Sequence, residues 1–275
     1  MSEPTVVLLE DADACSLAAA ERIIESRVGA IEERGEAHWA TTGGSTPGAI
    51  YRHLALGPLR AEINWHKVRL WWTDERFVPI DHPQSNAKIA MDLLVDAEAY
   101  ANESGTGESG VDVATGRAPG VPIRRGDVHP FPVGPAIGEG RDPDWCAARY
   151  VEQLRADGPE ENNDGVPAFD LVLLGIGPDG HILSVFPDSP AFDTEALAVG
   201  IPAPTHVEPH IARVTLNPSI VSAAREIVVV SHGSGKAAIL ADVLHSPIEP
   251  RRLPSQLARR AGATWFLDRA AAAQL

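Results

Sequence analysis

The stretch Phe169-Asp-Leu-Val-Leu-Leu-Gly-Ile-Gly-Pro-Asp-Gly-His181 combines a short apolar segment with a glycine-rich turn that ends on a histidine. Leu171 to Leu174 form a continuous apolar run, which is typical of a strand buried on both faces of a parallel sheet. The turn after such a strand leaves the carboxyl edge of the sheet, where ligands bind in open α/β proteins. We therefore expect His181 to lie at a ligand site, as a candidate general base.

Gly175, Gly177 and Gly180 also match the G-x-G-x-x-G pattern of dinucleotide-binding turns. That function needs a sustained helix after the third glycine, whereas Pro187 and Pro190 limit any helix here to about two turns. A tight strand-to-helix turn with an incidental histidine is the simpler alternative. The other motifs of the chain decide between these interpretations.

Strands and helices alternate along the chain, as the spacing of apolar residues indicates. We expect further strands at residues 5–9, 37–41, 68–72, 213–216, 227–231 and 264–267, and helices at about 14–33, 49–56, 86–95, 142–155 and 237–244. This order predicts a layered, mostly parallel, Rossmann-like α/β sheet flanked by helices, in a single domain over residues 1–275. Residues from about 102 to 120 are rich in Gly, Ser, Thr and Asp and predict a flexible surface loop.

The composition excludes several classes of partner. Lys and Arg number 23 against 38 Asp and Glu, and the formal net charge of −15 argues against a nucleic-acid partner. A small anionic substrate is compatible with this charge, because a few arginines in one cleft dominate locally. Cys15 and Cys146 show no metal or redox spacing. Since we find no targeting segment and no apolar run long enough to span a bilayer, we expect a cytoplasmic protein without a membrane partner.

Gly43-Gly44-Ser45-Thr46 follows a predicted strand and opens a predicted helix. Free backbone N–H groups and the helix dipole favour an anion at such a place, and the two hydroxyls add donors. The alternative is an ordinary helix cap. Pro47 stands where a nucleophile elbow would need its last glycine, which argues against a serine hydrolase.

Three cations also follow or begin predicted strands. Asp74-Glu75-Arg76 offers an arginine that can hold a phosphate through two hydrogen bonds, with acids that can bind sugar hydroxyls or orient neighbours; the alternative is a surface salt-bridge cluster. Gly233-Ser-Gly-Lys236 presents a lysine beside free amides, without the spacing of a Walker A loop; the alternative is a solvated first-turn lysine. Arg213 begins a predicted strand and is a third candidate for binding an anion. The alternative is that it is only a charged residue at the edge of a strand.

His206 and His210 are four residues apart with Glu208 between them, which suggests a metal site. Pro209 disfavours the helix that would bring both rings to one face. We therefore expect a loop without a metal ion.

Taken together, the motifs resemble those of the glucosamine-6-phosphate isomerase/6-phosphogluconolactonase family. The resemblance covers most of the chain and rests on Thr42-Gly-Gly-Ser-Thr-Pro47, Trp72-Thr-Asp-Glu-Arg-Phe-Val-Pro79, Ser85-Asn86, Gly175-Ile-Gly-Pro-Asp-Gly-His181 with Ser184-Val-Phe-Pro187, and Gly233-Ser-Gly-Lys236. Two flanking segments separate the two branches of the family. The residues after His181 and the Arg76-Phe-Val-Pro79 segment are similar to the motifs of the lactonases and not to those of the deaminases. The chain departs from the usual pattern of the family at two places. The loop at about 102–120 is longer than usual, and Thr205-His206 stands where the family often has a lysine.

The resemblance implies the fold of the glucosamine-6-phosphate deaminases and ribose-5-phosphate isomerases, and hydrolysis of 6-phospho-D-glucono-1,5-lactone to 6-phospho-D-gluconate in the oxidative pentose phosphate pathway. His181 would be the general base and Asp179 would orient its ring, unless Asp179 is a simple turn residue. The phosphate would be bound by Ser45, Thr46, Arg76, Arg213 and Lys236. Oxyanion or sugar contacts would come from Asp74 and from the Gly43-Gly44 or the Gly175–Gly177 amides.

We expect no cofactor and no metal, and a monomer or small homo-oligomer whose partner is a small sugar-phosphate lactone. Two alternatives stay open. One is an amino sugar phosphate deaminase/isomerase, and the other is a non-catalytic sugar-phosphate sensor, against which the absence of a DNA-binding helix-turn-helix pattern argues.

Overall fold

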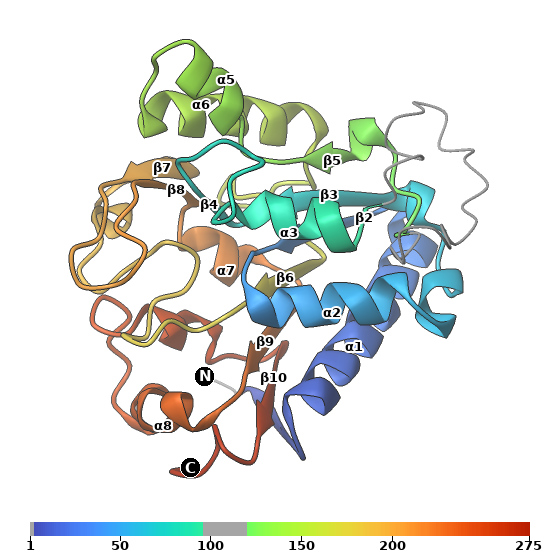
Figure 1. Cartoon of the computed structure of the whole chain (residues 1–275), viewed down its shortest axis with the longest axis vertical. Coiled ribbons are helices and arrows are strands. Elements are labelled where there is room, and N and C mark those ends of the chain that lie inside the picture. The colour runs from blue at the N-terminus through green and yellow to red at the C-terminus, as the bar shows by residue number, and fades with distance from the viewer. Residues whose placement is uncertain (1–2, 96–119) are drawn as a thin grey trace.

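A seven-stranded parallel sheet forms the centre of the molecule in the computed structural model, which describes residues 3–95 and 120–275 (Figure 1). All its neighbouring strands are parallel. The strand order is β1 (Thr5–Leu9), β10 (Ala263–Asp268), β9 (Ile227–Ser231), β6 (Leu171–Leu174), β2 (Ala37–Thr41), β3 (Val68–Trp72) and β5 (Val128–His129). Every residue of β2, β6 and β9 is buried, and the sequences of β6 and β9 are accordingly almost entirely apolar. The predicted parallel α/β architecture is confirmed.

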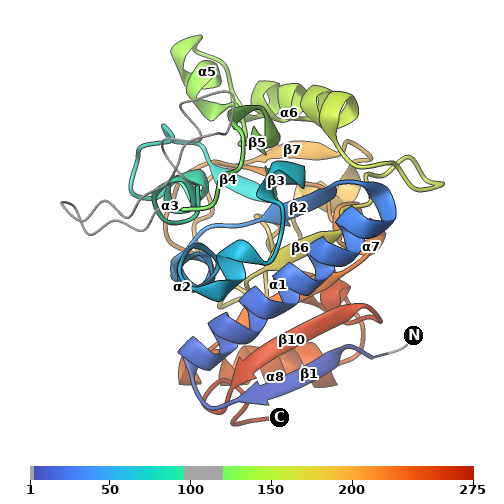
Figure 2. The ribbon, with the colours of Figure 1, turned by 90° about the vertical axis from the view of Figure 1, so that its right-hand side faces the viewer.

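Helices cover the sheet on both sides. Figures 1 and 2 show α1 (Ala12–Arg34) and α8 (Ala237–His245) on opposite sides of β9 and β10. Asp11 caps α1 by accepting a hydrogen bond from the Ala14 N–H, and Gly35 ends it in the left-handed conformation that glycine favours. The other α-helices among the described residues are α2 (Ser45–Ala55), α3 (Asn86–Leu93), α5 (Val133–Gly138), α6 (Pro143–Asp157) and α7 (Ser219–Ala223). Within the described ranges, none of the helices has both the length and the apolar composition of a membrane span.

A second, antiparallel sheet departs from the sequence-based expectation. It pairs β4 (Asp74–Arg76) with β8 (Arg213–Leu216), and β8 with β7 (Ala198–Ile201). The sequence predicts 213–216 as a strand of the mostly parallel sheet, and it predicts no strand at residues 74–76. Apolar spacing identifies a strand but does not indicate which sheet it joins.

The segment after β6 contains no sustained helix, in agreement with the limit that Pro187 and Pro190 were expected to set. Residues 181–189 form turns with an isolated bridge between Ile182 and Val185. The next helical turn is a short 3-10 segment at Pro190–Asp193. The dinucleotide interpretation, which requires a helix here, therefore has no structural support. The loop predicted at about 102–120 lies outside the described residues except for Gly120.

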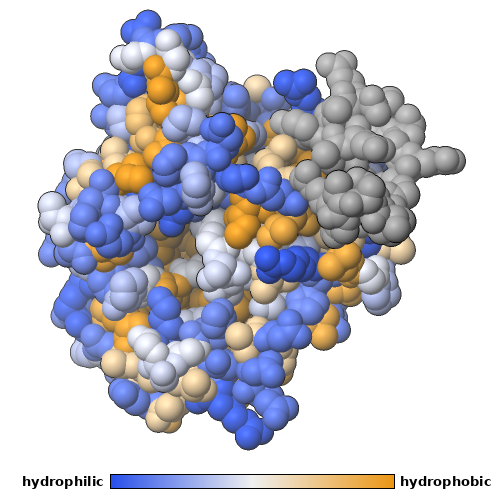
Figure 3. All heavy atoms as spheres, viewed as in Figure 1, coloured by the Kyte–Doolittle hydropathy of each residue, from blue (hydrophilic) through white to orange (hydrophobic). Residues whose placement is uncertain are grey.

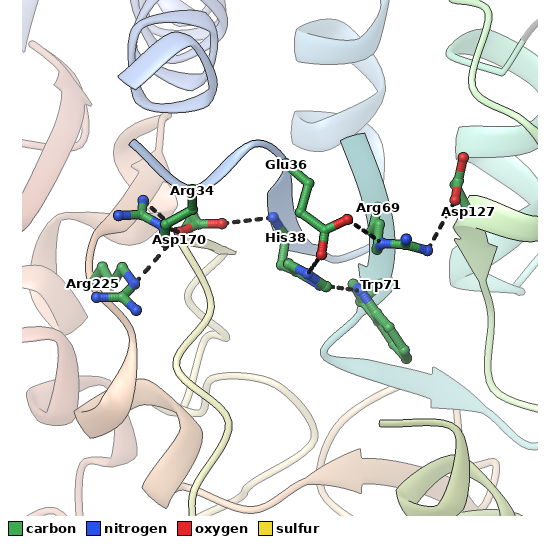
Figure 4. Close-up of polar contacts among 8 residues, drawn as sticks. All are labelled: Arg34, Glu36, His38, Arg69, Trp71, Asp127, Asp170 and Arg225. Atoms are coloured by element: carbon green, nitrogen blue, oxygen red, sulfur yellow. Dashed lines mark hydrogen bonds and ion pairs between the residues drawn. The ribbon is translucent and has the colours of Figure 1, made fainter. Parts of the chain in front are cut away.

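Charged residues connect the amino-terminal ends of the central strands (Figure 4). The Asp170 carboxylate is 5% exposed and accepts hydrogen bonds from the His38 N–H at 2.7 Å and from the Arg34 guanidinium at 2.8–3.0 Å. Arg225 lies 3.5 Å from the same carboxylate. Asp170 thus joins β2 and the start of β6 to the end of α1.

A second chain of contacts continues from β2 to β5. Glu36 accepts from His38 Nε2 at 3.0 Å and from Arg69 Nε at 2.9 Å, and Arg69 also donates to Asp127 at 3.0 Å (Figure 4). Burial lowers the pKa of His38, although Glu36 opposes the shift. The neutral ring can then accept the Trp71 indole N–H through Nδ1.

We expect Asp170→Asn to lower the free energy of unfolding by about 1–3 kcal/mol, because a single amide oxygen cannot satisfy the buried donors that the carboxylate satisfies. Urea denaturation measures the change, with the exposed Asp81→Asn as the matched control. Equal midpoints for the two variants would show that this network does not stabilise the fold.

Candidate active site

A cavity of about 380 Å³ opens at the carboxyl edge of the main sheet. In Figure 3 this face of the molecule is hollowed left of its centre, between the segments that Figure 1 labels β8 and α2. The loops after β2, β3, β6 and β9 supply its wall, together with the start of β8. Of the predicted site residues, all but Asp179 line it, namely Gly43, Gly44, Ser45, Thr46, Asp74, Arg76, Gly175, Gly177, His181, Arg213 and Lys236.

His181 and Asp179 form a hydrogen-bonded pair at this cavity. The Nδ1 atom of His181 lies 2.5 Å from Asp179 Oδ1, which also accepts the His181 backbone N–H at 3.2 Å. Because an ionised carboxylate only accepts hydrogen bonds, this contact places a proton on Nδ1. The neutral ring then has its lone pair on Nε2, which is the tautomer that a general base requires.

Asp179 is held in its ionised form by two histidines. Burial raises its pKa, but the bonds and charge of His181 and the bond from His206 outweigh burial and lower the pKa overall. The carboxylate is 18% exposed and contacts His206 Nε2 at 2.9 Å through Oδ2. Asp179 lies in the turn and accepts the His181 backbone N–H, and its contact with Nδ1 also orients the His181 ring.

Gly177 leaves the space that the His181 ring occupies. A Cβ atom built on Gly177 would lie 2.0 Å from His181 Nδ1, which no real contact allows. The Gly177 N–H donates to the His181 carbonyl at 2.8 Å, and Gly180 N–H donates to the Gly177 carbonyl at 3.1 Å. The Gly177 amide was predicted as a possible oxyanion donor. That prediction is wrong, because this N–H already donates inside the turn.

The amino terminus of α2 faces the same cavity. Gly44 precedes the helix with φ 110°, a conformation that glycine favours, and no side chain caps the first turn. Gly43 packs so closely on Asn86 that a Cβ would lie 2.2 Å from its Oδ1 atom. Thr46 Oγ1 contacts His232 Nε2 at 2.9 Å. The uncapped first turn suits an anion, as predicted from the sequence.

Two arginines lie directly opposite each other on neighbouring strands. Arg76 of β4 pairs in register with Arg213 of β8, and both line the cavity. Arg213 is 4% exposed and donates to the carbonyls of Pro209 and Ile211, both at 3.0 Å. Burial and the charge of Arg76 lower the pKa of Arg213. Like charges at directly opposed positions repel, so this arrangement favours an anion between them.

Lys236 links two loops of the site. Its Nζ donates to the Ile176 carbonyl at 2.6 Å, and the side chain is partly buried rather than solvated. Burial lowers its pKa, although the charge of Asp179 opposes the shift. Lys236 therefore holds the Gly233–Lys236 turn against the loop that carries His181.

The acids Asp74 and Glu75 are buried, so the interpretation of this segment as a surface salt-bridge cluster is wrong for them. Asp74 accepts the hydroxyls of Thr42, Thr73 and Ser184 at 3.1, 3.2 and 2.7 Å. Glu75 accepts one hydroxyl and three backbone N–H groups, from Ser85, Arg76, Asn86 and Ala87. Burial raises the pKa of Glu75 to about 7 against these four bonds. Glu75 fixes the start of α3 to β4, and Asp74 is left facing the cavity.

Sequence reasoning missed the contribution of His206. It was weighed only as a metal ligand with His210, but the two rings have different partners: His206 contacts Asp179, whereas His210 contacts the Pro204 carbonyl and Glu208. No spacing rule indicates this contact, because the two residues belong to separate loops. Asn86 was noted as part of a motif but not as a residue of the cavity wall, and His232 was not noted; both line the cavity.

Comparisons with known proteins agree with this geometry. A family model described as glucosamine-6-phosphate isomerases/6-phosphogluconolactonase matches residues 10–266. The 6-phosphogluconolactonase of Streptomyces coelicolor is 33% identical over 275 residues, covering 99% of this chain and 95% of that protein. The 6-phosphogluconolactonase of Mycobacterium tuberculosis is 32% identical over 273 residues, covering 98% of each.

Solved structures show the same relationship. The structure of 6-phosphogluconolactonase from Trypanosoma brucei matches with a TM-score of 0.79 at 25% identity, covering 100% of both chains. A monomeric glucosamine-6-phosphate deaminase shares the fold, with a TM-score of 0.71 at 18% identity, covering 98% of this chain and 100% of that one. The chain therefore belongs to the glucosamine-6-phosphate isomerase/6-phosphogluconolactonase family.

Proposed function

We propose that this protein hydrolyses 6-phospho-D-glucono-1,5-lactone to 6-phospho-D-gluconate, the second step of the oxidative pentose phosphate pathway. The observation that carries the proposal is the His181 ring, bonded to Asp179, in a cavity that Arg76, Arg213 and Lys236 also line. A base and several cations in one cavity suit a substrate with both an ester carbonyl and a phosphate. The relatives from Streptomyces coelicolor and Mycobacterium tuberculosis, which match nearly the whole chain, are named 6-phosphogluconolactonase, which supports the same reaction.

The proposed chemistry begins with water at the lactone carbonyl. His181 Nε2 takes a proton from the water as its oxygen bonds to C1, and a tetrahedral oxyanion forms. Collapse of this intermediate breaks the bond from C1 to the ring oxygen. The imidazolium returns its proton to that oxygen, so the products are a carboxylic acid, which ionises, and an open-chain hydroxyl. Asp179 keeps the ring in the reactive tautomer and stabilises the transient imidazolium.

The anionic parts of the substrate have separate donors. We assign the phosphate to Arg76 and Arg213, with Lys236 nearby and with Ser45 and Thr46 at the start of α2. For the oxyanion, the Gly43, Gly44 and Gly175 amides remain as candidates, since the Gly177 amide is occupied. Asp74 is placed to accept a sugar hydroxyl.

We further propose that residues 1–275 act as one domain in the cytoplasm, as a monomer or small homo-oligomer without a nucleic-acid or membrane partner. A continuous hydrophobic core among the described residues supports the single domain. The net charge of −15 supports the exclusion of nucleic acid.

His181→Ala should lower kcat by about 10²- to 10⁴-fold with little change in KM, because it removes the base and leaves the phosphate contacts. Production of 6-phosphogluconate is followed with 6-phosphogluconate dehydrogenase, and the spontaneous opening of the lactone is subtracted. His245→Ala, at the exposed end of α8, is the control. Normal turnover by folded His181→Ala would refute the assigned base, and ammonia release from glucosamine 6-phosphate would indicate the isomerase branch instead.

Arg76→Ala should raise KM by about 10- to 100-fold and change kcat less, because charge-assisted hydrogen bonds to the phosphate are lost in the ground state and the transition state alike. Steady-state kinetics with the lactone measure the effect. The exposed Arg141→Ala controls for loss of positive charge. Equal KM values for the two variants would remove Arg76 from the phosphate site.

Gly177→Ala should lower kcat/KM by about 10²-fold, because the added methyl group displaces the His181 ring. The matched control is Gly134→Ala, where an added Cβ meets no atom within 4 Å. Thermal unfolding separates this effect from loss of the fold. A fully active Gly177→Ala enzyme would mean that catalysis does not need the ring in its present place.

A further inference from the structure

The Asp179 carboxylate lies between two imidazole rings. One oxygen, Oδ1, contacts His181 Nδ1 at 2.5 Å, and the other, Oδ2, contacts His206 Nε2 at 2.9 Å. A carboxylate that is hydrogen-bonded at one oxygen can still rotate about the Cβ–Cγ bond of the aspartate. A donor at the second oxygen restricts this rotation and therefore fixes the direction of the hydrogen bond to His181.

Phe186 makes a second connection between the two histidines. Its ring centroid lies 4.6 Å from that of His181 and 5.6 Å from that of His206, in an edge-on arrangement with the latter. Phe186 itself is 6% exposed. His206 is therefore packed as well as hydrogen-bonded beside the proposed catalytic pair, although 52% of its side chain is exposed.

The loop that carries His206 also belongs to the cavity. The next two residues, Val207 and Glu208, line it, and Arg213 donates to the carbonyls of Pro209 and Ile211 farther along the same loop. The proposed phosphate-binding arginine thus holds the loop whose histidine holds Asp179. One segment connects the binding end of the site with its catalytic end.

We propose that His206 is a positioning residue that acts through Asp179 to keep Nδ1 of His181 bonded and Nε2 free for the attacking water. The inference rests on the proposed lactonase function and adds to it a residue from another loop. The charged or titratable groups around the carboxylate are His181, His206 and, through charge alone, Lys236. Without His206, the Asp179 carboxylate loses one of its two histidine partners. It then interacts more strongly with the proton on His181 Nδ1.

His206→Ala should lower kcat about tenfold, as expected for loss of one hydrogen bond to a charged group at a half-exposed site, and KM should change little. The acid limb of the kcat–pH profile should move to higher pH, because the less neutralised Asp179 makes His181 more basic. His206→Gln keeps an N–H donor without a titrating ring. This variant should have most of the wild-type kcat, and the acid limb of its kcat–pH profile should lie where it does in the wild type. His210→Ala, in the same loop without a contact to Asp179, should leave the limb in place.

NMR titration of the His181 ring, without substrate, tests the link independently of turnover. An upward shift of its pKa in His206→Ala, reversed in His206→Gln, supports the proposal. An unchanged titration, or an equal shift in His210→Ala, overturns it even in an active lactonase. A wild type that fails to hydrolyse the lactone overturns the proposed function, and the titration still decides whether His206 acts on His181.

Discussion

Four neighbouring parallel strands, β9, β6, β2 and β3, end at one edge of the sheet, and the loops that follow them supply most of the cavity wall. Because the strands are parallel and buried on both faces, their carboxyl ends cannot be displaced one at a time without disturbing the core. The loops are therefore carried by a rigid frame. The charged network at the opposite edge, around Asp170, holds β2 and β6 together where they begin (Figure 4).

Within this frame, contacts between loops define the site more than any single motif does. Lys236 joins the turn after β9 to the loop after β6, Ser184 joins that loop to Asp74 after β3, and Arg213 holds the loop of His206. Each contact uses a polar side chain that is buried or partly buried. Buried polar groups that lose a partner are costly, so these contacts favour one arrangement of the loops over alternatives.

Much of the main sheet and the wall of the cavity were predictable from the sequence. Short segments rich in apolar residues indicated six of its seven strands. The rule that ligands bind at the carboxyl edge predicted that His181, Arg76, Lys236 and the Gly43–Thr46 loop lie together. The two-residue strand β5 carried too little pattern to be detected. The antiparallel sheet was missed because β4 is three residues of charged sequence, Asp74-Glu75-Arg76, whose burial depends on partners far along the chain. The contact from His206 to Asp179 depends on tertiary packing alone, and no local pattern reports it.

A cavity with a carboxylate-oriented imidazole and opposed arginines is expected to open a phosphorylated lactone by adding water. Direct observation by NMR of freshly prepared 6-phospho-D-glucono-1,5-lactone, with the wild-type protein and without it, tests that claim most simply. We expect conversion to 6-phospho-D-gluconate at a rate proportional to protein concentration and far above spontaneous opening. A folded protein that leaves the lactone to open at its spontaneous rate would contradict it.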